Sequence, residues 1–401
     1  MNRKDFEIRK LDSTHLDQFN ELLRYVFQVT ESDLARSGYV DSDEIIQAKR
    51  PILMKADVFG FFDEDDLISQ IAIYPFETNI HGVIYKVGGV TGVGTYPEYA
   101  NMGLISELIV TALNQMRENK QYISYLYPYS VPFYRRKGWE IFCDKMSFEI
   151  KDTQLPKPTE VRGHVERLQI DDEDVYKMYD TFARATHGAI IRDELAWEEF
   201  WRWENEIDRF AAVYYDELGL PTGLCFYWIK NEILNIKEMI YLNEDARNGL
   251  WNFISAHFSM VEYVKGFNFT GETIAFSLQD SDIIETIAPY FMARIVDVKE
   301  FLLRYPFDII GDPFYIKVSD PIAEWNNKSF HLDWSSGELV ITESEGGVGV
   351  AMDINTLSTL FMGYKSVAYL TKIGRISGDM KAMRLLRKSI FSDKAHFSDY
   401  F

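Results

Sequence analysis

A glycine-rich stretch from Gly88 to Ile105 constrains the fold more than any other part of the chain. It predicts a β-strand loosened by glycines, a short loop, and a helix that runs on from Leu104 with apolar residues recurring on one face. The first amides of such a helix have no intrahelical acceptor, and the helix dipole adds positive potential there. Because Gly103 has no Cβ, a phosphate can approach the backbone closely. The stretch therefore predicts an anion-binding site, although strand–loop–helix turns that contain a glycine are common.

The segment after the glycine-rich stretch continues an order of strands and helices that resembles a known family. A strand over Tyr122–Leu126 precedes a short helix with Phe133-Tyr134, a helix stop at Lys137-Gly138, and a further strand over Ile141–Ile150. This order resembles the GCN5-related N-acetyltransferases (GNAT). In that family a splayed strand binds the pantetheine arm, a glycine-rich loop binds the pyrophosphate, and an aromatic residue after the fifth strand meets the sulfur.

Composition limits the class of protein. With 401 residues, of which 47% are hydrophobic, the chain can build two or three cores. No segment approaches the ~20 apolar residues that a membrane span needs, and the charged start of the chain does not resemble a signal peptide. The two cysteines, Cys143 and Cys225, do not form a disulfide framework. We therefore expect a cytoplasmic protein without a membrane span.

The charge of the chain narrows the choice of partners. The formal net charge is -20 and the sequence pI is about 4.8. Nucleic acids and anionic membranes bind basic surfaces, so neither is expected as a partner. Acidic residues at the entrance of a site attract a cationic small substrate. An acidic surface also keeps a protein soluble without any role in binding. Acidic residues at Glu31, Asp33 and 41–44 follow a predicted helix over His15–Phe27, in the region that overlies the acceptor in acetyltransferases of this type.

The middle of the chain contains a short internal repeat of an earlier segment. When Gly103 is aligned with Gly249, Pro97–Leu104 lies over Asn243–Leu250, and four of the eight residues are identical. An apolar strand pattern precedes both copies and an amphipathic helix pattern follows both. This predicts a duplicated domain at about 160–295, with chance similarity as the alternative. The second copy has no match to Phe133-Tyr134, so we expect it to be catalytically idle.

The pattern changes after residue 292, where a short helix is followed by four strands and three helices. The predicted strands and helices are Phe314–Val318, Lys328–Trp334, Glu338–Glu343 and Gly349–Met352, and Ile354–Met362, Ser366–Lys372 and Met380–Phe391.

The whole chain resembles the Eis (enhanced intracellular survival) family of N-acetyltransferases. The markers are Val93-Gly94-Thr95 with 101–105, Pro128–Trp139, Met292–Leu302, Asp353–Gly378 and the terminal Phe401. The resemblance implies a mixed α+β and α/β fold: a catalytic GNAT domain at 1–152, a second GNAT domain at 160–292, and a sterol-carrier-protein-like α+β domain at 293–401. It also implies a homo-hexamer, no metal, and amine-bearing acceptors of the aminoglycoside class.

The same resemblance assigns the site residues. Tyr134 matches the general acid, and the free carboxylate of Phe401 matches the general base. The positions that match the acetyl-CoA site are Val93, Gly94, Thr95, Asn101, Met102, Gly103, Leu104, Ile105, Ser106, Tyr129 and Ser130. The usual arginines before the loop glycine are replaced by Ala100-Asn101-Met102, so the cofactor phosphates must rely on backbone amides or on Arg135, Arg136 and Lys137.

The chemistry sets demands on these groups. An acceptor amine with a pKa near 10 must lose a proton, and a carboxylate with an ordinary pKa of about 3.5 needs burial to become a suitable base. A tyrosine with a pKa of about 10 donates to a thiolate whose acid has a pKa of about 8.5 at a cost of roughly 2 kcal/mol. The competing interpretations are that Tyr134 is only packed, that Phe401 only anchors the chain end, and that His81 or His187 is the base.

Three functions follow from this reading of the sequence. The first is acetyl-CoA-dependent N-acetylation of polycationic small molecules. The second is acetylation of protein lysines or polyamines. The third is a non-catalytic module that binds CoA or an apolar ligand.

Overall fold

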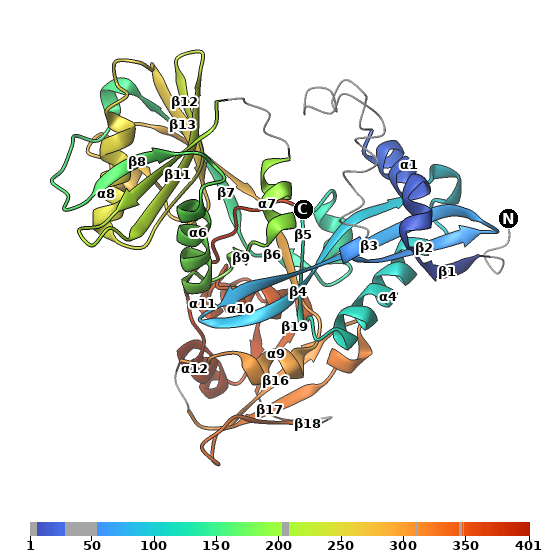
Figure 1. The fold of residues 1–401 in the computed structure, drawn as a ribbon. Coiled ribbons are helices and arrows are strands. Elements are labelled where there is room, and N and C mark those ends of the chain that lie inside the picture. Colours follow the sequence, from blue (N-terminus) through green and yellow to red (C-terminus); the bar gives the residue numbers. More distant parts are fainter. Residues whose placement is uncertain (1–5, 29–53, 203–207, 309–310, 345–346, 348) are drawn as a thin grey trace.

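The fold is taken from a computed structural model, which describes residues 6–28, 54–202, 208–308, 311–344, 347 and 349–401. Three β-sheets organise these residues (Figure 1). Each sheet carries helices, and the sheets correspond in order to three units, of which the third is the smallest. The mixed α and β fold class expected from the sequence is therefore confirmed.

The first sheet is mostly antiparallel, with one parallel pair between β4 and β5. Helices α1 (Leu16–Phe27), α4 (Leu104–Glu118) and α5 (Val131–Arg135) accompany this sheet. In order, its strands are β1 (Glu7–Lys10), β2 (Asp57–Asp63), β3 (Asp66–Ile80), β4 (Val83–Thr95), β5 (Ile123–Leu126), β15 (Met292–Ile295) and β6 (Glu140–Ile141), with β9 (Ile190–Ile191) paired to β3.

The second sheet repeats this plan, again with one parallel pair, here between β12 and β13. Its helices are α6 (Glu173–Ala185), α7 (Glu194–Trp201) and α8 (Glu244–Ser255). In order, its strands are β14 (Ile284–Pro289), β7 (Asp144–Lys151), β13 (Tyr263–Asn268), β12 (Ile233–Tyr241), β11 (Pro221–Lys230), β10 (Phe210–Tyr215) and β8 (His164–Leu168).

The two sheets share a long antiparallel ribbon. Strands β7 and β14 pair in the second sheet, and β6 and β15 pair in the first. Between them, the Phe142 amide donates to the Phe291 carbonyl at 3.1 Å and the Tyr290 amide donates to the Cys143 carbonyl at 3.0 Å. The single strand predicted over Ile141–Ile150 is therefore wrong: the chain passes from one sheet to the other at the buried residues 142 and 143.

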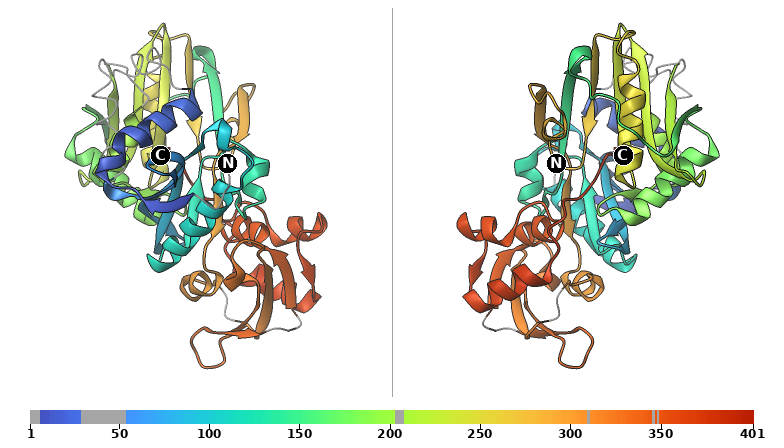
Figure 2. Two further views of the ribbon diagram at one scale, coloured as in Figure 1. Left: turned by 90° about the vertical axis from the view of Figure 1, so that its right-hand side faces the viewer. Right: turned by 90° about the vertical axis from the view of Figure 1, so that its left-hand side faces the viewer.

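The third unit projects from one end of the other two (Figure 2). Helix α9 (Val298–Arg304) leads into its five-stranded sheet, and α10 (Ile354–Phe361), α11 (Val367–Lys372) and α12 (Met380–Ser389) follow the fourth strand. In order, the strands are β18 (Val340–Ser344), β17 (Ser329–Asp333), β16 (Phe314–Ser319), β19 (Gly349–Asp353) and β20 (Ser377–Gly378).

The chain after α12, residues 390–401, is called the tail. It contains no helix or strand and runs back from the third unit to the other two, where the C-terminus lies (Figures 1 and 2). Within the described part of the chain, no helix has the length and apolar character that crossing a bilayer requires.

The internal repeat in the sequence aligns two glycines that occupy different positions in their helices. Gly103 is the N-cap of α4, with a φ of 81°, whereas Gly249 lies in the interior of α8. A Cβ at Gly249 would lie 2.2 Å from the Tyr214 ring, so this glycine serves close packing of α8 on β10. The duplication is real, but the glycine-to-glycine alignment that led to it is wrong.

Candidate functional site: the gap between β4 and β5

The candidate site begins where β4 and β5 separate. The two strands pair in parallel from Val87–Val90 against Ile123–Leu126, and β5 then ends. Strand β4 continues to Thr95, paired only with β3, across a register shift typical of a β-bulge. Among the described strands, none therefore lies beside the edge of β4 from Thr91 to Thr95 on the β5 side. This unpaired edge is called the β4–β5 gap.

The loop before α4 presents a row of backbone donors. Among the described residues, the amides of Asn101 to Ile105 have no acceptor. Asn101 and Gly103 have φ angles of 63° and 81°, and left-handed residues in such a row turn successive amides toward one side. The Ser106 amide is already used, since it donates to the Gly103 carbonyl at 3.0 Å. This loop fits a diphosphate, with the α4 dipole behind it.

The other residues matched to the acetyl-CoA site lie around this loop. Val93 and Met102 pack against the apolar cluster that contains Leu104. Gly94 and Thr95 are held by Ser69, whose Oγ donates to the Gly94 carbonyl at 3.1 Å and lies 2.6 Å from Thr95 Oγ1.

On the far side of the gap, the turn from β5 to α5 carries Tyr129 and Ser130. Tyr129 is 89% exposed. Ser130 is the N-cap of α5, but its hydroxyl makes no capping hydrogen bond.

One lysine lies beside the first turn of α4. Lys137 Nζ donates to Ser106 Oγ, in the first turn of α4, at 2.8 Å. Burial, followed by the neighbouring Arg136 charge, lowers the pKa of Lys137. Arg135 is committed elsewhere: its guanidinium lies 2.8 Å from Glu140, which also pairs with Arg375 of the third unit at 2.8 Å.

Tyr134 lies on the α4 face of the first sheet. It is 7% exposed and belongs to the apolar cluster formed with α4, next to Trp139. Burial raises the pKa of Tyr134 to about 12. Among the described residues its hydroxyl has no hydrogen-bond partner, so the group is a neutral phenol with a proton available for donation.

Phe401 lies on the opposite face of the same sheet. A Cβ at Gly88 would meet Met116 of α4, whereas a Cβ at the next residue, Gly89, would lie 2.6 Å from the Phe401 ring. Only glycine at position 89 therefore leaves room for the Phe401 ring beside β4. The main-chain oxygen of Phe401 accepts a hydrogen bond from Thr91 Oγ1 at 3.2 Å, at the point where β4 leaves β5.

The second unit holds the tail in place through a buried cluster, called the tail latch: Arg192, Glu238, Ser398 and Asp399. Arg192 Nε donates to Asp399 at 2.7 Å and its Nη1 donates to Glu238 at 3.2 Å. The guanidinium also lies 3.7 Å from the centres of two aromatic rings, Tyr179 and Phe200. Burial of Glu238 would by itself raise its carboxyl pKa, but Arg192, His396 and Ser398 lower that pKa to about 2.

The alternative bases lie elsewhere. His81 and His187 stack with ring centres 3.7 Å apart at the turn of the β3–β4 hairpin, the end of β4 that is remote from Thr95. Burial lowers the pKa of His81 to about 4 and, together with the His81 charge, that of His187 to about 3. The acidic residues Glu31, Asp33 and 41–44 lie outside the described residues.

Comparison with known proteins agrees with this geometry. Residues 7–142 and residues 188–295 each match a model described as an acetyltransferase (GNAT) domain, and residues 298–398 match a sterol carrier protein domain. An uncharacterized N-acetyltransferase of Streptomyces griseus is 21% identical over 347 residues, which cover 79% of this chain and 82% of that protein. Its counterpart from Streptomyces avermitilis is 21% identical over 369 residues, covering 85% and 88%.

Solved structures share the whole architecture. A probable N-acyltransferase of Enterococcus faecalis superposes with a TM-score of 0.87 at 28% identity, covering 99% of both chains. Eis1 of Mycobacterium abscessus superposes with a TM-score of 0.82 at 15% identity, covering 99% of this chain and 100% of that one.

A protein built in this way is an acetyltransferase with tandem catalytic-type folds. The GNAT fold implies acetyl-CoA as the acetyl donor and an amine-bearing acceptor. More particularly, the chain is a GNAT-type N-acetyltransferase in which two acetyltransferase domains precede a sterol carrier protein domain.

Two features of the site were not predicted from the sequence. The tail latch brings Arg192 onto Asp399 across 207 residues, and nothing in the sequence near either residue marks the pair. Thr91 lies inside the glycine-rich stretch, but its contact with Phe401 depends on the path of the tail.

Proposed function

We propose that the protein transfers acetyl from acetyl-CoA to amino groups of polycationic small molecules of the aminoglycoside type, as an Eis-like enzyme. The observation that carries the proposal is that Tyr134 and Phe401 lie on opposite faces of the sheet that contains the β4–β5 gap. An acid and a base on opposite sides suit direct transfer, in which the amine attacks from one side and the thiol leaves toward the other. The net charge of -20 favours cationic acceptors.

The cofactor residues divide the binding task. The amides of Asn101, Met102, Gly103, Leu104 and Ile105 would hold the diphosphate, and Lys137 would add a positive charge. Ser106 would act by placing Lys137, because its own amide is occupied.

The remaining residues would bind the other parts of the cofactor. The open edge of β4 at Val93, Gly94 and Thr95 would bind the amide groups of the pantetheine arm, and Tyr129 and Ser130 would line its other side. Bound acetyl-CoA would supply the activated acetyl group.

Tyr134 would donate its proton as the carbon–sulfur bond breaks. Its pKa of about 12 exceeds that of an ordinary thiol, about 8.5, so full proton transfer to the departing thiolate is uphill by about 5 kcal/mol. Donation as the bond breaks avoids a free thiolate, and the resulting tyrosinate would regain its proton from solvent. The raised pKa also keeps the phenol protonated throughout the neutral range.

Phe401, the last residue of the sequence, would accept the amine proton through its carboxylate. The Phe401 ring packs against Phe76 and Phe291, with ring centres 5.2 Å and 5.4 Å away, and these contacts fix the position of the chain end. The Thr91 hydroxyl would orient the carboxylate at the gap.

A thiol-release assay with a panel of amines tests the acceptor class. We expect release of CoA with a kanamycin-type aminoglycoside at a kcat/KM at least about tenfold higher than with spermidine or a lysine peptide. Activity confined to spermidine or to the peptide would instead assign the enzyme to polyamines or protein lysines and would overturn the aminoglycoside proposal.

The proposal includes the cellular location and the oligomeric state of the enzyme. Both cysteines are free and buried, which fits a cytoplasmic protein. The resemblance to the Eis family further implies a homo-hexamer. Light scattering of the purified full chain checks this: a mass of six chains supports it, and a mass of one chain contradicts it.

A further inference from the structure

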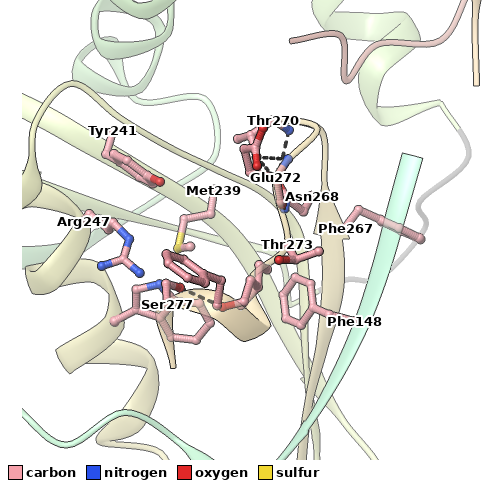
Figure 3. Close-up of a pocket in the computed structure, with 13 residues that line it drawn as sticks. Phe148, Met239, Tyr241, Arg247, Phe267, Asn268, Thr270, Glu272, Thr273 and Ser277 are labelled. Carbon is pink, nitrogen blue, oxygen red and sulfur yellow. Dashed lines mark hydrogen bonds between the residues drawn. The ribbon is translucent and has the colours of Figure 1, made fainter. Parts of the chain in front are cut away.

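The second GNAT domain has a cavity where its own parallel strands separate. Strands β12 and β13 pair only from Ile233–Ile236 against Tyr263–Gly266, and both then continue. Where they part, a cavity of about 600 Å³ opens between these strands, α8 and the segment after β13 (Figure 3). Its position corresponds to that of the β4–β5 gap in the first domain.

The start of α8, whose acidic residues do not line the cavity, does not suit a diphosphate. The first turn of α8 carries two carboxylates, Glu244 and Asp245. Its N-cap, Asn243, already accepts a hydrogen bond from the Ala246 amide at 2.8 Å, so the helix start is occupied by the protein itself. Negative side chains at a helix start repel a phosphate that the dipole would otherwise attract. The second domain has therefore lost the feature that would hold CoA.

The lining is mainly aromatic and apolar, and it includes one cation. Arg247 and Tyr241 lie on one side of the cavity and Phe148 and Phe267 on the other (Figure 3). The remaining apolar lining residues are Met239, Trp251, Ile274 and Phe276. Phe276 is 93% exposed, an unusual state for a phenylalanine at the rim of a cavity.

The cation has no counter-ion in the part of the chain that the structure describes. Among the described residues, the only hydrogen bond of the Arg247 side chain is to Asn248 Oδ1, at 3.4 Å, and no carboxylate pairs with it. The carboxylate that borders the cavity, Glu272, forms an exposed ion pair with Lys394 of the tail at 3.2 Å. The half-buried guanidinium therefore lacks a negative partner in a largely apolar surrounding.

We propose that this cavity binds a compact apolar carboxylic acid, most favourably an aromatic one, with Arg247 as the partner of its carboxylate. Arginine binds a carboxylate through two parallel N–H donors, and this pairing strengthens where water is excluded. The aromatic lining covers the apolar body of the ligand, and the volume lies in the range of small-molecule sites. The binding does not depend on the acceptor or on the acid and base proposed for the first domain.

Calorimetry on the full chain with 1-naphthoate tests the proposal. We expect one molecule to bind per chain, whereas 1-naphthylmethylamine, of similar size and opposite charge, does not bind. Arg247→Gln weakens naphthoate binding at least about tenfold, and Phe276→Ser, at an exposed position, also weakens it. Arg184→Gln removes a surface arginine that is already paired with Asp180, and it leaves binding unchanged.

The outcome is decisive in either direction. Saturating CoA must leave naphthoate binding intact, because the two ligands occupy different domains. Absence of naphthoate binding, equal binding of the amine, unchanged binding in Arg247→Gln with its melting temperature preserved, or displacement by CoA would each overturn the proposal. None of these outcomes bears on the acetyltransferase activity, which is measured separately.

Discussion

Burial makes Tyr134 a weaker acid than an ordinary tyrosine and keeps its proton in place, and the proposed role as proton donor predicts a specific kinetic effect. In Tyr134→Phe the ring and its packing are kept and only the hydroxyl is lost. We expect kcat to fall by about 10² with little change in the KM for acetyl-CoA, because a positioned proton donor contributes at that level. Tyr227→Phe, a buried tyrosine of the second domain, is the control and should retain full activity. Unchanged turnover in Tyr134→Phe would place the acid elsewhere.

Lys137 carries the second prediction at this scale. Its ammonium lies at the first turn of α4, so Lys137→Met should raise the KM for acetyl-CoA about tenfold, the effect of losing one charge-assisted contact to phosphate, while kcat changes little. Added salt should narrow the difference between variant and parent. Lys372→Met, at the exposed end of α11, is the matched control. An equal KM in the two variants would remove Lys137 from the cofactor site.

The role of a single residue was predictable where the neighbouring residues form a recognisable sequence pattern. Gly103 precedes a helix, and Tyr134 follows a strand at the family's spacing, so both were assigned from neighbouring residues. Arg192 was not, because a buried ion pair is defined by its partners in space. Those partners lie 46 and 207 residues away.

At the scale of elements, the tail is positioned by the second domain. The tail latch fixes Ser398 and Asp399, and Tyr290 also donates to the Asp399 carbonyl at 2.8 Å, two residues before the chain end. Arg192→Lys keeps the charge but loses the forked contacts to both carboxylates. We expect kcat to fall about tenfold while the KM for acetyl-CoA is preserved, since the hydrogen bonds of Arg192 among the described residues go to Glu238 and the tail and not to the cofactor residues.

The control for this prediction is Arg184→Lys, a surface arginine on α6. Activity and melting temperature are measured in parallel for both variants. If Arg192→Lys lowers the melting temperature but leaves kcat unchanged, the latch is structural only and does not position Phe401.

The stacked histidines predict how stability depends on pH. An unfolded histidine has a pKa of about 6.5, and burial lowers that of His81 to about 4. Between these values the unfolded chain binds the additional proton, so the free energy of unfolding falls as the pH falls from 6.5 toward 4. For His81 alone the full effect is at most about 3 kcal/mol.

His81→Asn tests this dependence, because asparagine tolerates the φ of 48° at this position. The loss of melting temperature between pH 7 and pH 5 should be smaller in the variant than in the parent, and the exposed His164→Asn should behave like the parent. An identical pH dependence in all three proteins would contradict the account.

Elements were predictable from periodicity, but their pairing was not. The helices after Gly103 and Met380 appear close to their expected limits. In place of the single strand expected over Ile141–Ile150, the structure has two strands, β6 and β7, which belong to different sheets. The alternation of apolar residues predicts which face of a strand is buried. It does not predict the sheet to which the strand belongs.

At the scale of the whole molecule, the shared ribbon joins the two GNAT domains. We retain 1–152, 160–292 and 293–401 as the proposed domain limits, although β7 lies in the second sheet and β15 in the first. A fragment of residues 1–152 lacks β15, which lies between β5 and β6, and should show no cooperative thermal transition. A fragment that melts cooperatively near the temperature of the full chain would contradict this dependence.

The central claim is that the carboxylate of Phe401 is the base, presented by the tail at the β4–β5 gap. The most direct test is the full-length protein with Phe401 converted by chemical ligation to its C-terminal carboxamide, which removes the charge and keeps the ring in place. Thiol release is then measured with saturating acetyl-CoA and an aminoglycoside. The account predicts a fall in kcat of at least about 10² with unchanged acetyl-CoA binding; a carboxamide protein that turns over at the parent rate would contradict it.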